Sequence, residues 1–379
     1  MRILIWQELF WPHVGGIEVL AIKLILALQQ RGYEIIVVTR QDSLDLPKEA
    51  TYQGIPVYRY PFWSDLTSGK LDQVVARRSQ IAKLKRAFAP DLVHINSFGP
   101  SVLFHYDTTN AYPTPVLLTL HTAYQPINAQ SLGQDGLFRK TLGAANWVTC
   151  VSNAVFAHWR QLVPEIAAYS SVVYNGLVPP AIFPEPLPTD PPCLLCLGRL
   201  HPDKCFDLAL KAFASVRDRF PRAHLVIAGD GDERPVLERQ VADMGLDNVE
   251  FVGWVAPGKI FELMSAATIV IVPSRYEGLP TVALEAGMMA RPVVATRVGG
   301  VPEIVVDQET GLLVDPGDWR ALAAAIEFLL ARPESATEFG QAARRRIQRL
   351  FNFERYIDGY DALYRKLVTG DTTETTTLS

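Results

Sequence analysis

Two glutamates and two cations in the second half of the chain have the types and spacing for chemistry on an anionic ligand. Glu277 and Glu285 are eight residues apart in the run YEGLPTVALEA, and Arg199 and Lys204 are five apart, directly after an apolar run. Arginine can bind a phosphate through two parallel hydrogen bonds, and lysine adds a point charge. The two glutamates do not fit a glycosidase acid and base, because eight helical residues rise ~12 Å and such carboxylates lie roughly 5–9.5 Å apart. A solvated or helix-capping role is the alternative for both.

The segment around the two glutamates has the pattern of a strand, a turn, a helix and a second strand, which lays two parallel strands side by side. Apolar runs at Ile269–Val272 and 292–295 flank a helix-like stretch that runs to about Ala290, with Pro280 expected in its first turn. Glu285 lies where this helix is apolar on nearly every side, and a buried glutamate without a partner is rare. The helix N-terminus would open at the carboxyl edge of the sheet, where its free N–H groups and dipole attract phosphate.

The run EGLPTVALEA resembles the signature of the family-four retaining glycosyltransferases (glycosyl transferases group 1), in which seven residues separate two glutamates. The later runs PVVATRVGGVPEIV and TGLLVDPGD match that family as well. The resemblance covers almost the whole chain and implies the GT-B fold, an α/β architecture of two Rossmann-like domains that face each other across a cleft. It implies transfer of a sugar, of hexose type, from a nucleotide diphosphate sugar with retention of the anomeric configuration. No metal is obligatory in that reaction, and no cofactor is needed besides the donor substrate.

The resemblance assigns the cations and the glutamates to the donor. The run GRL followed by Lys204 matches the family's diphosphate clamp, so Arg199 and Lys204 would stabilise the leaving diphosphate. Glu277 would hold sugar hydroxyls, and Glu285 would hold the ribose. The loop after the first glutamate would contact the donor through Gly278 and Leu279.

A glycine pair near the start of the chain lies between a strand expected at 2–6 and a helix expected at 17–31. This is a nucleotide-type α/β unit, in which glycine lets the backbone approach a ligand closely. By resemblance, Gly15 and Gly16 face the donor diphosphate and the acceptor. A plain tight turn is the alternative.

Two more positions follow predicted strands. His121 ends the strand expected at Val116–Leu120, and its context LLTLHT resembles that of the family's sugar-contacting histidine. A lone histidine is otherwise more often structural. Gly253 follows a strand expected at 248–252, and this strand and its loop resemble those that hold the nucleotide base in the family.

The length of 379 residues is comfortable for two domains, and a net charge of −4 gives no sign of nucleic-acid binding. We expect an acceptor-side domain at 1–178 and a nucleotide-sugar-binding domain at 193–352. Between them lies a linker at 179–192, half of whose residues are proline. A terminal helix at about 353–368 resembles the one that returns to the first domain in the family, and a threonine-rich tail at 369–379 is expected to be disordered.

Three cysteines and a histidine have the spacing of a zinc knuckle: Cys193, Cys196, His201 and Cys205. Cys193 and Cys196 lie in the run CLLCLG, which is a buried-strand pattern. Their odd offset points the two thiols to opposite faces of a strand, so we reject a metal site.

The run GDGDER contains half of a dinucleotide-binding fingerprint. Arg234 stands where the third glycine belongs, and no suitable acidic residue follows. A nicotinamide cofactor is therefore rejected.

The helix expected at Leu71–Phe88 carries several cations and no acid after Asp72. A solvated face is the ordinary interpretation of such a helix. The more specific alternative is a patch that binds an anionic membrane surface. No apolar run approaches the ~20 residues that span a bilayer. We expect a cytoplasmic protein of cell-envelope or polysaccharide biosynthesis, with a glycan, lipid-linked or small-molecule acceptor and peripheral membrane contact. The cations of this helix are Arg77, Arg78, Lys83, Lys85 and Arg86.

Three departures from the family pattern affect loops near the site. Cys205 and Ala290 stand where the family usually has glycine, and Leu177 and Val178 replace the usual Val-Asp pair. Two other classes stay open. A nucleotide-sugar epimerase of the same architecture would convert the donor without an acceptor, and a non-catalytic nucleotide-sugar-binding protein would turn nothing over.

Overall fold

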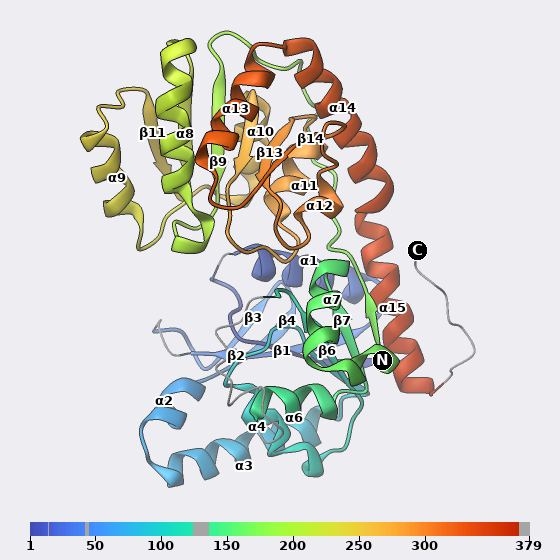
Figure 1. Cartoon of the computed structure of the whole chain (residues 1–379). Coiled ribbons are helices and arrows are strands. Elements are labelled where there is room, and N and C mark those ends of the chain that lie inside the picture. The colour runs from blue at the N-terminus through green and yellow to red at the C-terminus, as the bar shows by residue number, and fades with distance from the viewer. Residues whose placement is uncertain (14, 42–44, 124–135, 371–379) are drawn as a thin grey trace. The chain divides into compact units, whose positions relative to one another are not determined.

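The computed structural model describes residues 1–13, 15–41, 45–123 and 136–370, and the chain divides into two compact units (Figure 1). Unit 1 comprises Met1–Tyr174 and Tyr356–Ser379, and unit 2 comprises Asn175–Arg355. Of the predicted disordered tail 369–379, residues 371–379 lie outside the described ranges.

The described part of unit 1 is built on an eight-stranded sheet with the order β3-β4-β2-β1-β5-β6-β7-β8. All neighbours pair in parallel except β3 and β4, which form an antiparallel hairpin at one edge. The central strands are largely apolar, as expected of a parallel sheet that is buried on both faces, and their buried polar residues include His94 and Thr119. The strands are β1 Arg2–Gln7, β2 Glu34–Arg40, β3 Glu49–Tyr52, β4 Ile55–Tyr60, β5 Leu92–Ile95, β6 Val116–Leu120, β7 Trp147–Cys150 and β8 Ser170–Val172.

Helices connect these strands, and the last helix of the chain completes the unit. Their lengths range from single turns to the long amphipathic helices α1 and α3. The helices are α1 Gly16–Gln30, α2 Phe62–Thr67, α3 Leu71–Phe88, α4 Val102–Tyr106, α6 Leu137–Ala144, α7 Asn153–Leu162 and α15 Phe353–Thr369, with 3-10 turns η1 Thr109–Ala111 and η2 Pro164–Tyr169.

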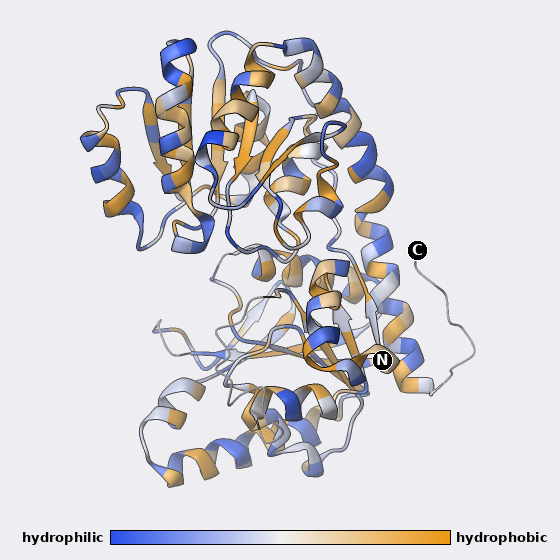
Figure 2. Ribbon diagram, viewed as in Figure 1, coloured by the Kyte–Doolittle hydropathy of each residue, from blue (hydrophilic) through white to orange (hydrophobic). Residues whose placement is uncertain are grey.

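Unit 2 has a six-stranded parallel sheet with the order β11-β10-β9-β12-β13-β14. This is the strand order 3-2-1-4-5-6 of a doubly wound nucleotide-binding fold, which reverses direction between its first and fourth strands. Figure 2 shows β9 and β13 as hydrophobic and α14 as largely hydrophilic. The strands are β9 Cys193–Leu197, β10 His224–Ala228, β11 Val249–Gly253, β12 Ile269–Val272, β13 Val293–Thr296 and β14 Gly311–Val314.

The helices of unit 2 bury apolar faces against this sheet. A single cluster of buried residues joins α8 and α13 to β9, β10 and β12. The helices are α8 Phe206–Arg219, α9 Arg234–Asp243, α10 Ile260–Ala266, α11 Thr281–Met288, α12 Val301–Ile304, α13 Trp319–Leu330 and α14 Pro333–Leu350, with 3-10 turns η3 Pro202–Lys204 and η4 Pro257–Lys259.

The structure confirms every strand expected from an apolar run, with ends that shift by at most two residues. One local prediction is wrong. Pro280 is the N-cap residue, with an extended ψ of 118°, and α11 begins only at Thr281. An Asn-Gly sequence such as that at 175–176 is typical of a turn, but Asn175 lies buried in a segment that continues to a bridge between Leu177 and Asn352.

The proline-rich segment 179–192 is fastened to unit 2 by a buried arginine. Arg291 is 1% exposed, and both of its terminal nitrogens donate to the carbonyl of Glu185 at 3.1 Å. Thr268 donates its hydroxyl to the carbonyl of Pro188 at 2.6 Å. These bonds supply backbone partners that proline residues cannot supply for one another.

The terminal helix α15 is held on unit 1 through a buried polar network. His94 Nδ1 lies 2.6 Å from the hydroxyl of Tyr364, and His94 Nε2 lies 2.8 Å from the hydroxyl of Thr119. Thr119 also contacts the hydroxyl of Tyr360 at 3.2 Å. Burial, with a smaller contribution from His121, lowers the pKa of His94 to about 3.

Five described residues other than glycine have a left-handed backbone, and two of them bear on the family pattern. Cys205 has a φ of 50° and Ala290 a φ of 54°. These are two of the positions where the resembled family usually has glycine, and the structure gives the physical reason. A Cβ atom in the left-handed region costs roughly 1–2 kcal/mol, which glycine avoids.

We expect the histidine network to weaken unit 1 in acid. The unfolded chain binds a proton at His94 near the ordinary pKa of 6.5, whereas the folded protein resists protonation down to about pH 3. The stability that His94 contributes is therefore complete above pH 6.5 and is lost as the pH falls below it. When the pH falls from 7.5 to 5.5, the free energy of unfolding should drop in both proteins. The drop should be about 1.4 kcal/mol smaller in His94→Gln than in the wild type, because the variant has no histidine to protonate on unfolding. Urea unfolding at both pH values measures this, and equal losses would contradict it.

Glycine at either left-handed position should stabilise unit 2. Cys205→Gly and Ala290→Gly should each raise the free energy of unfolding by ~1 kcal/mol, since relief of strain exceeds the added chain entropy. Ala283→Gly in the middle of α11 is the matched control and should lower it by ~1 kcal/mol. Thermal unfolding of the three variants provides the comparison. A loss of stability in all three would show that the left-handed backbone is not strained.

Candidate functional site

The strand order of unit 2 places two loops side by side at the carboxyl edge of its sheet. β9 pairs in parallel with β12, and each strand leads directly into a loop that carries predicted site residues. We call residues 198–205, which follow β9, the clamp loop, and residues 273–280, which follow β12, the glutamate loop. Ligands of open α/β sheets bind where the strand order reverses, and that point lies between these two strands.

The two loops are joined by a side-chain ion pair and a backbone hydrogen bond. Lys204 Nζ lies 2.6 Å from Glu277 Oε1. The hydroxyl of Ser274 donates to the same carboxylate oxygen at 2.6 Å. The backbone N–H of Arg275 donates to the carbonyl of Asp203 at 2.8 Å. The structure therefore brings together two of the predicted site residues, one from each loop.

Arg199 is placed differently from Lys204. Its side chain is exposed and makes no hydrogen bond or ion pair with any residue in the described ranges. Its carbonyl accepts a hydrogen bond from the N–H of His201 at 2.9 Å, which helps to shape the loop. Arg199 thus offers a free guanidinium at the edge where an anion is expected, and Lys204 offers an ammonium that already has a carboxylate partner.

The loop after β13 packs directly against the glutamate loop. A Cβ atom on Gly299 would lie 1.7 Å from the carbonyl oxygen of Glu277. The N–H of Gly300 donates to the carbonyl of Gly278 at 3.0 Å. Only glycine allows this approach, so Gly299 determines how closely the glutamate loop packs against the loop after β13.

The half fingerprint after β10 has a structural explanation. A Cβ atom on Gly229 would lie 1.8 Å from the carbonyl oxygen of Gly198, and one on Gly231 would lie 2.3 Å from that of Leu200. These glycines therefore make room for the clamp loop, which is a sufficient reason for them without a dinucleotide. The N–H of Gly229 also donates to the carbonyl of Gly253 at 2.7 Å. The predicted base-binding position is thereby tied to the same edge.

Two residues predicted to bind the donor, Leu279 and Glu285, lie just before α11 and on it. Glu285 lies on α11 and is partly buried. Leu279 is buried, and its carbonyl accepts a hydrogen bond from the side-chain amide of Asn175 at 3.3 Å. Leu279 can therefore contribute its backbone N–H rather than its side chain to a ligand.

In unit 1, the predicted glycine pair begins α1. Gly15 is the N-cap residue, with an extended backbone, and Gly16 is the first helical residue. A Cβ atom on Gly15 would lie 2.3 Å from a carboxylate oxygen of Glu18. The pair therefore presents a helix N-terminus of unit 1 at the carboxyl end of β1.

His121 lies just beyond the carboxyl end of β6, close to the end of β5. Its Nε2 lies 2.7 Å from the carbonyl oxygen of Asn96 and donates a hydrogen to it. Burial lowers the pKa of His121 to about 4, and this hydrogen bond opposes the shift only in part. The ring is therefore neutral at pH 7, with Nδ1 as a hydrogen-bond acceptor.

Ser274 belongs to the site although its sequence position drew no prediction. It is 1% exposed, and its hydroxyl contacts Glu277. The spacing Ser-x-x-Glu is the pattern of a capping box and could have drawn attention to this pair. The pair does not cap a helix, because α11 begins four residues after Glu277.

The basic helix α3 has a smaller cationic face than its composition indicates. Arg77 Nε lies 2.7 Å from a carboxylate oxygen of Asp65, and both side chains are largely buried. Lys85 is 1% exposed and donates to the carbonyl of His105 at 2.9 Å, and burial lowers the pKa of this lysine to about 7. No helix in the described ranges has the length and apolarity to cross a bilayer. The exposed cations of α3 are Arg78, which pairs with Asp107, together with Lys83 and Arg86.

The cysteines of the zinc-like pattern are buried free thiols. Cys193 and Cys196 lie on β9, and burial raises the pKa of Cys193 to about 11. Cys205 directs its sulfur to the carbonyl of Pro202 at 3.3 Å. Within the described residues, no group of three or more His, Cys, Asp or Glu side chains could hold a metal ion.

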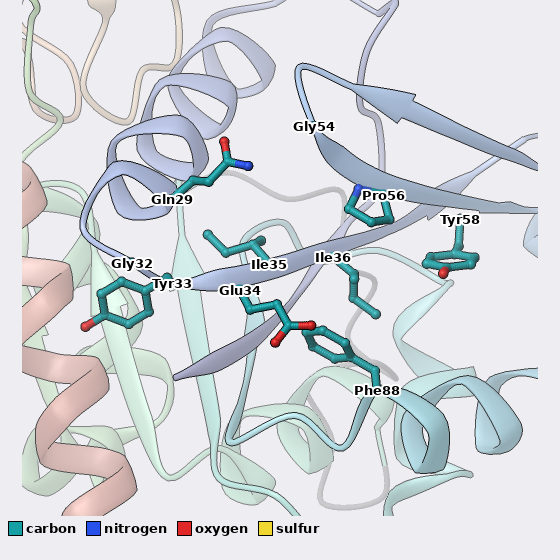
Figure 3. A pocket seen from close by; sticks show the side chains of 10 residues that line it. All are labelled: Gln29, Gly32, Tyr33, Glu34, Ile35, Ile36, Gly54, Pro56, Tyr58 and Phe88. Carbon is teal, nitrogen blue, oxygen red and sulfur yellow. The ribbon is translucent and has the colours of Figure 1, made fainter.

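A cavity of about 520 Å³ lies at the amino ends of the strands of the unit 1 sheet, near the starts of β2 and β4 (Figure 3). Its lining includes Gln29, Glu34, Tyr58 and Phe88. Gly15, Gly16 and His121 follow the carboxyl ends of their strands, so none of the predicted site residues lines this cavity.

Comparison with known proteins identifies the family of the chain. Residues 14–179 match the model "Glycosyltransferase Family 4", and residues 179–346 match "Glycosyl transferases group 1". The chain is 30% identical over 321 residues to an alpha-maltose-1-phosphate synthase of Mycolicibacterium smegmatis, which covers 75% of this chain and 81% of that protein.

Two solved structures have the same fold. Sucrose-phosphate synthase from Thermosynechococcus elongatus matches with a TM-score of 0.83 and 25% identity, over 98% of this chain and all of the other. HepE of Anabaena in complex with UDP-glucose matches with a TM-score of 0.78 and 20% identity, over 97% of this chain and all of the other. The resemblance seen in the sequence is confirmed: this chain belongs to the glycosyl transferases group 1 family and is a glycosyltransferase of the GT-B fold.

Proposed function

We propose that this glycosyltransferase moves a hexose from a nucleotide diphosphate sugar to its acceptor and retains the anomeric configuration. The observation that carries the proposal is the contact between Lys204 and Glu277 at the point where the unit 2 sheet reverses. A cation suits the negative charge of a diphosphate, and a neighbouring carboxylate can accept hydrogen bonds from sugar hydroxyls. HepE, which shares the fold, is itself known in complex with UDP-glucose.

The chemistry follows from where charge develops. Cleavage of the bond between the anomeric carbon and the phosphate oxygen leaves both bonding electrons on the diphosphate. Arg199 and Lys204 stabilise this charge together with N–H groups of the segment from Gly278 to the start of α11 at Thr281. The acceptor hydroxyl attacks on the face that the diphosphate leaves, and a phosphate oxygen takes its proton. The reaction then needs no carboxylate nucleophile and no metal ion.

The two glutamates have separate tasks in this proposal. Glu277 holds sugar hydroxyls while the ring distorts, and Glu285 holds the ribose, which does not change during the reaction. Gly253 and its loop contact the base. In unit 1, Gly15 and Gly16 approach the diphosphate, and neutral His121 accepts a hydrogen bond from a sugar hydroxyl through Nδ1.

For the acceptor we propose a glycan or lipid-linked saccharide used in building a cell envelope or polysaccharide. Alpha-maltose-1-phosphate synthase and sucrose-phosphate synthase are named for saccharides of hexoses, which supports a hexosyl transfer. We further propose a cytoplasmic location with peripheral contact at an anionic membrane. Exposed Trp63, Leu71 and Val75 lie on α2 and the first turns of α3, and the exposed cations Lys83 and Arg86 lie on the last turns of α3; apolar and cationic side chains together suit a lipid headgroup layer.

The clamp is tested by removing each cation. Arg199→Ala and Lys204→Ala should each lower kcat by ~10²–10³-fold, since each removes a donor that stabilises charge in the transition state. Lys211→Ala, which removes an exposed lysine paired with Asp207, is the control and should change kcat by less than twofold.

Steady-state rates with a panel of UDP-, GDP- and ADP-sugars, with and without acceptor saccharides, give these values. Turnover within a few-fold of wild type in either clamp variant would overturn the assignment. Conversion of the donor to an epimer without an acceptor would indicate an isomerase, and donor binding without any turnover would indicate a binding protein.

Metal independence is tested with a chelator. Two cations and a helix N-terminus already stabilise the leaving diphosphate, so the rate should be unchanged within error after dialysis against EDTA. The measurement is the transfer rate before dialysis, after it, and after adding Mg²⁺ or Mn²⁺. A rate that disappears with EDTA and returns with the ion would refute this part of the proposal.

A further inference from the structure

We propose that Ser274 is a positioning residue, which holds the carboxylate of Glu277 in its working orientation while Lys204 is engaged by the donor diphosphate. This inference rests on the proposed function and adds to it a residue that acts through Glu277. Three observations carry it: the burial of the serine, the atom that its hydroxyl contacts, and the separate bonds that hold its backbone.

Both hydrogen-bond donors of Glu277 point at one oxygen atom. Lys204 Nζ and Ser274 Oγ each lie 2.6 Å from Oε1. The carboxylate is nearly buried, with a side-chain exposure of 8%. The other oxygen, Oε2, has no hydrogen-bond partner in the described part of the chain and is the atom left for a sugar hydroxyl.

Lys204 cannot bind the Glu277 carboxylate and the donor diphosphate equally well at the same time. Its side chain is 28% exposed, and its ammonium attracts any diphosphate that arrives at the clamp loop. A diphosphate carries more charge than one carboxylate, so donor binding weakens the bond between Lys204 and Glu277. Glu277 then needs a second donor that the phosphate does not attract.

Ser274 meets this need because it is neutral and fixed. It is 1% exposed, so its hydroxyl has no competing water. Its carbonyl accepts a hydrogen bond from the buried hydroxyl of Thr296 at 2.5 Å. The serine is therefore held from β13, independently of the clamp loop, and remains in place when Lys204 moves toward the diphosphate.

A purely structural role for the hydroxyl explains less. The loop backbone is already held by Thr296 and by the bond between the N–H of Arg275 and the carbonyl of Asp203. The Ser274 hydroxyl is not used for a backbone group, as it would be in a serine turn, and its bond goes to the Glu277 side chain. Removing it should leave the loop intact and release the carboxylate.

The test separates orientation from binding. Ser274→Ala should lower kcat by about 10–100-fold, the range for losing a hydrogen bond to a charged group. The donor KM and the calorimetric Kd of the nucleoside diphosphate product should stay within twofold, because neither requires an aligned Glu277. Ser274→Gly should match Ser274→Ala, and Ser64→Ala, which removes an exposed serine hydroxyl from α2, is the control and should behave as wild type.

A double-mutant cycle then identifies the route of the effect. If Ser274 acts through Glu277, adding Ser274→Ala to Glu277→Ala should change the residual rate by less than twofold. Multiplicative losses would overturn the proposal, as would a Ser274→Ala enzyme with the kcat of wild type or one whose product affinity falls in step with kcat. If the rate of Glu277→Ala is too slow to measure, the test rests on Ser274→Ala alone, in which kcat should fall while the affinity for the nucleoside diphosphate product stays unchanged. A wild-type protein that transfers no sugar would refute the proposed function, and an active wild type with an equally active Ser274→Ala would refute this inference alone.

Discussion

The loops at the carboxyl edge of unit 2 approach one another backbone to backbone, at distances that leave no space for a Cβ atom. Gly229 lies against the carbonyl of Gly198, Gly231 against that of Leu200, and Gly299 against that of Glu277. Each contact joins a loop that carries a proposed site residue to the loop of another strand. The positions of the cations and the glutamate therefore depend on steric exclusion, which is stiffer than side-chain hydrogen bonding because it cannot be exchanged for water.

Because the loops are rigid, the charged groups of the site are held at fixed positions. A lysine and a glutamate on flexible loops would pair wherever they met, and the pair would contribute little. Here the two groups are supplied by adjacent strands at a fixed separation, and a buried hydroxyl shares the carboxylate. The pair is then part of a preorganised surface, in which an arriving anion meets charges that are already in position.

The sequence predicts the strands and the site loops well, for a physical reason. Parallel strands buried on both faces are continuous apolar runs, and their loops follow immediately, so Arg199 and Glu277 are placed at strand ends without tertiary information. The partners of α3 could not be predicted in this way. Asp65 and His105, which bind Arg77 and Lys85, come from other elements, and nothing in the helix itself shows that these cations turn inward. The role of Ser274 could not be predicted fully either, because the Ser-x-x-Glu spacing that links it to Glu277 indicates a helix cap, and the structure forms no cap there.

The helix α15 has a consequence for the order in which the protein forms. His94 of unit 1 depends on the hydroxyl of Tyr364, a residue 270 positions later in the chain. A ribosome delivers the chain from its N-terminus, so every residue of unit 2 has been made before Tyr364 emerges. Until then, the interior of unit 1 contains a histidine and a threonine without their tyrosine partners. We therefore expect the first-made unit to be completed last, with the C-terminal helix as the final piece that makes the nascent protein resistant to proteolysis.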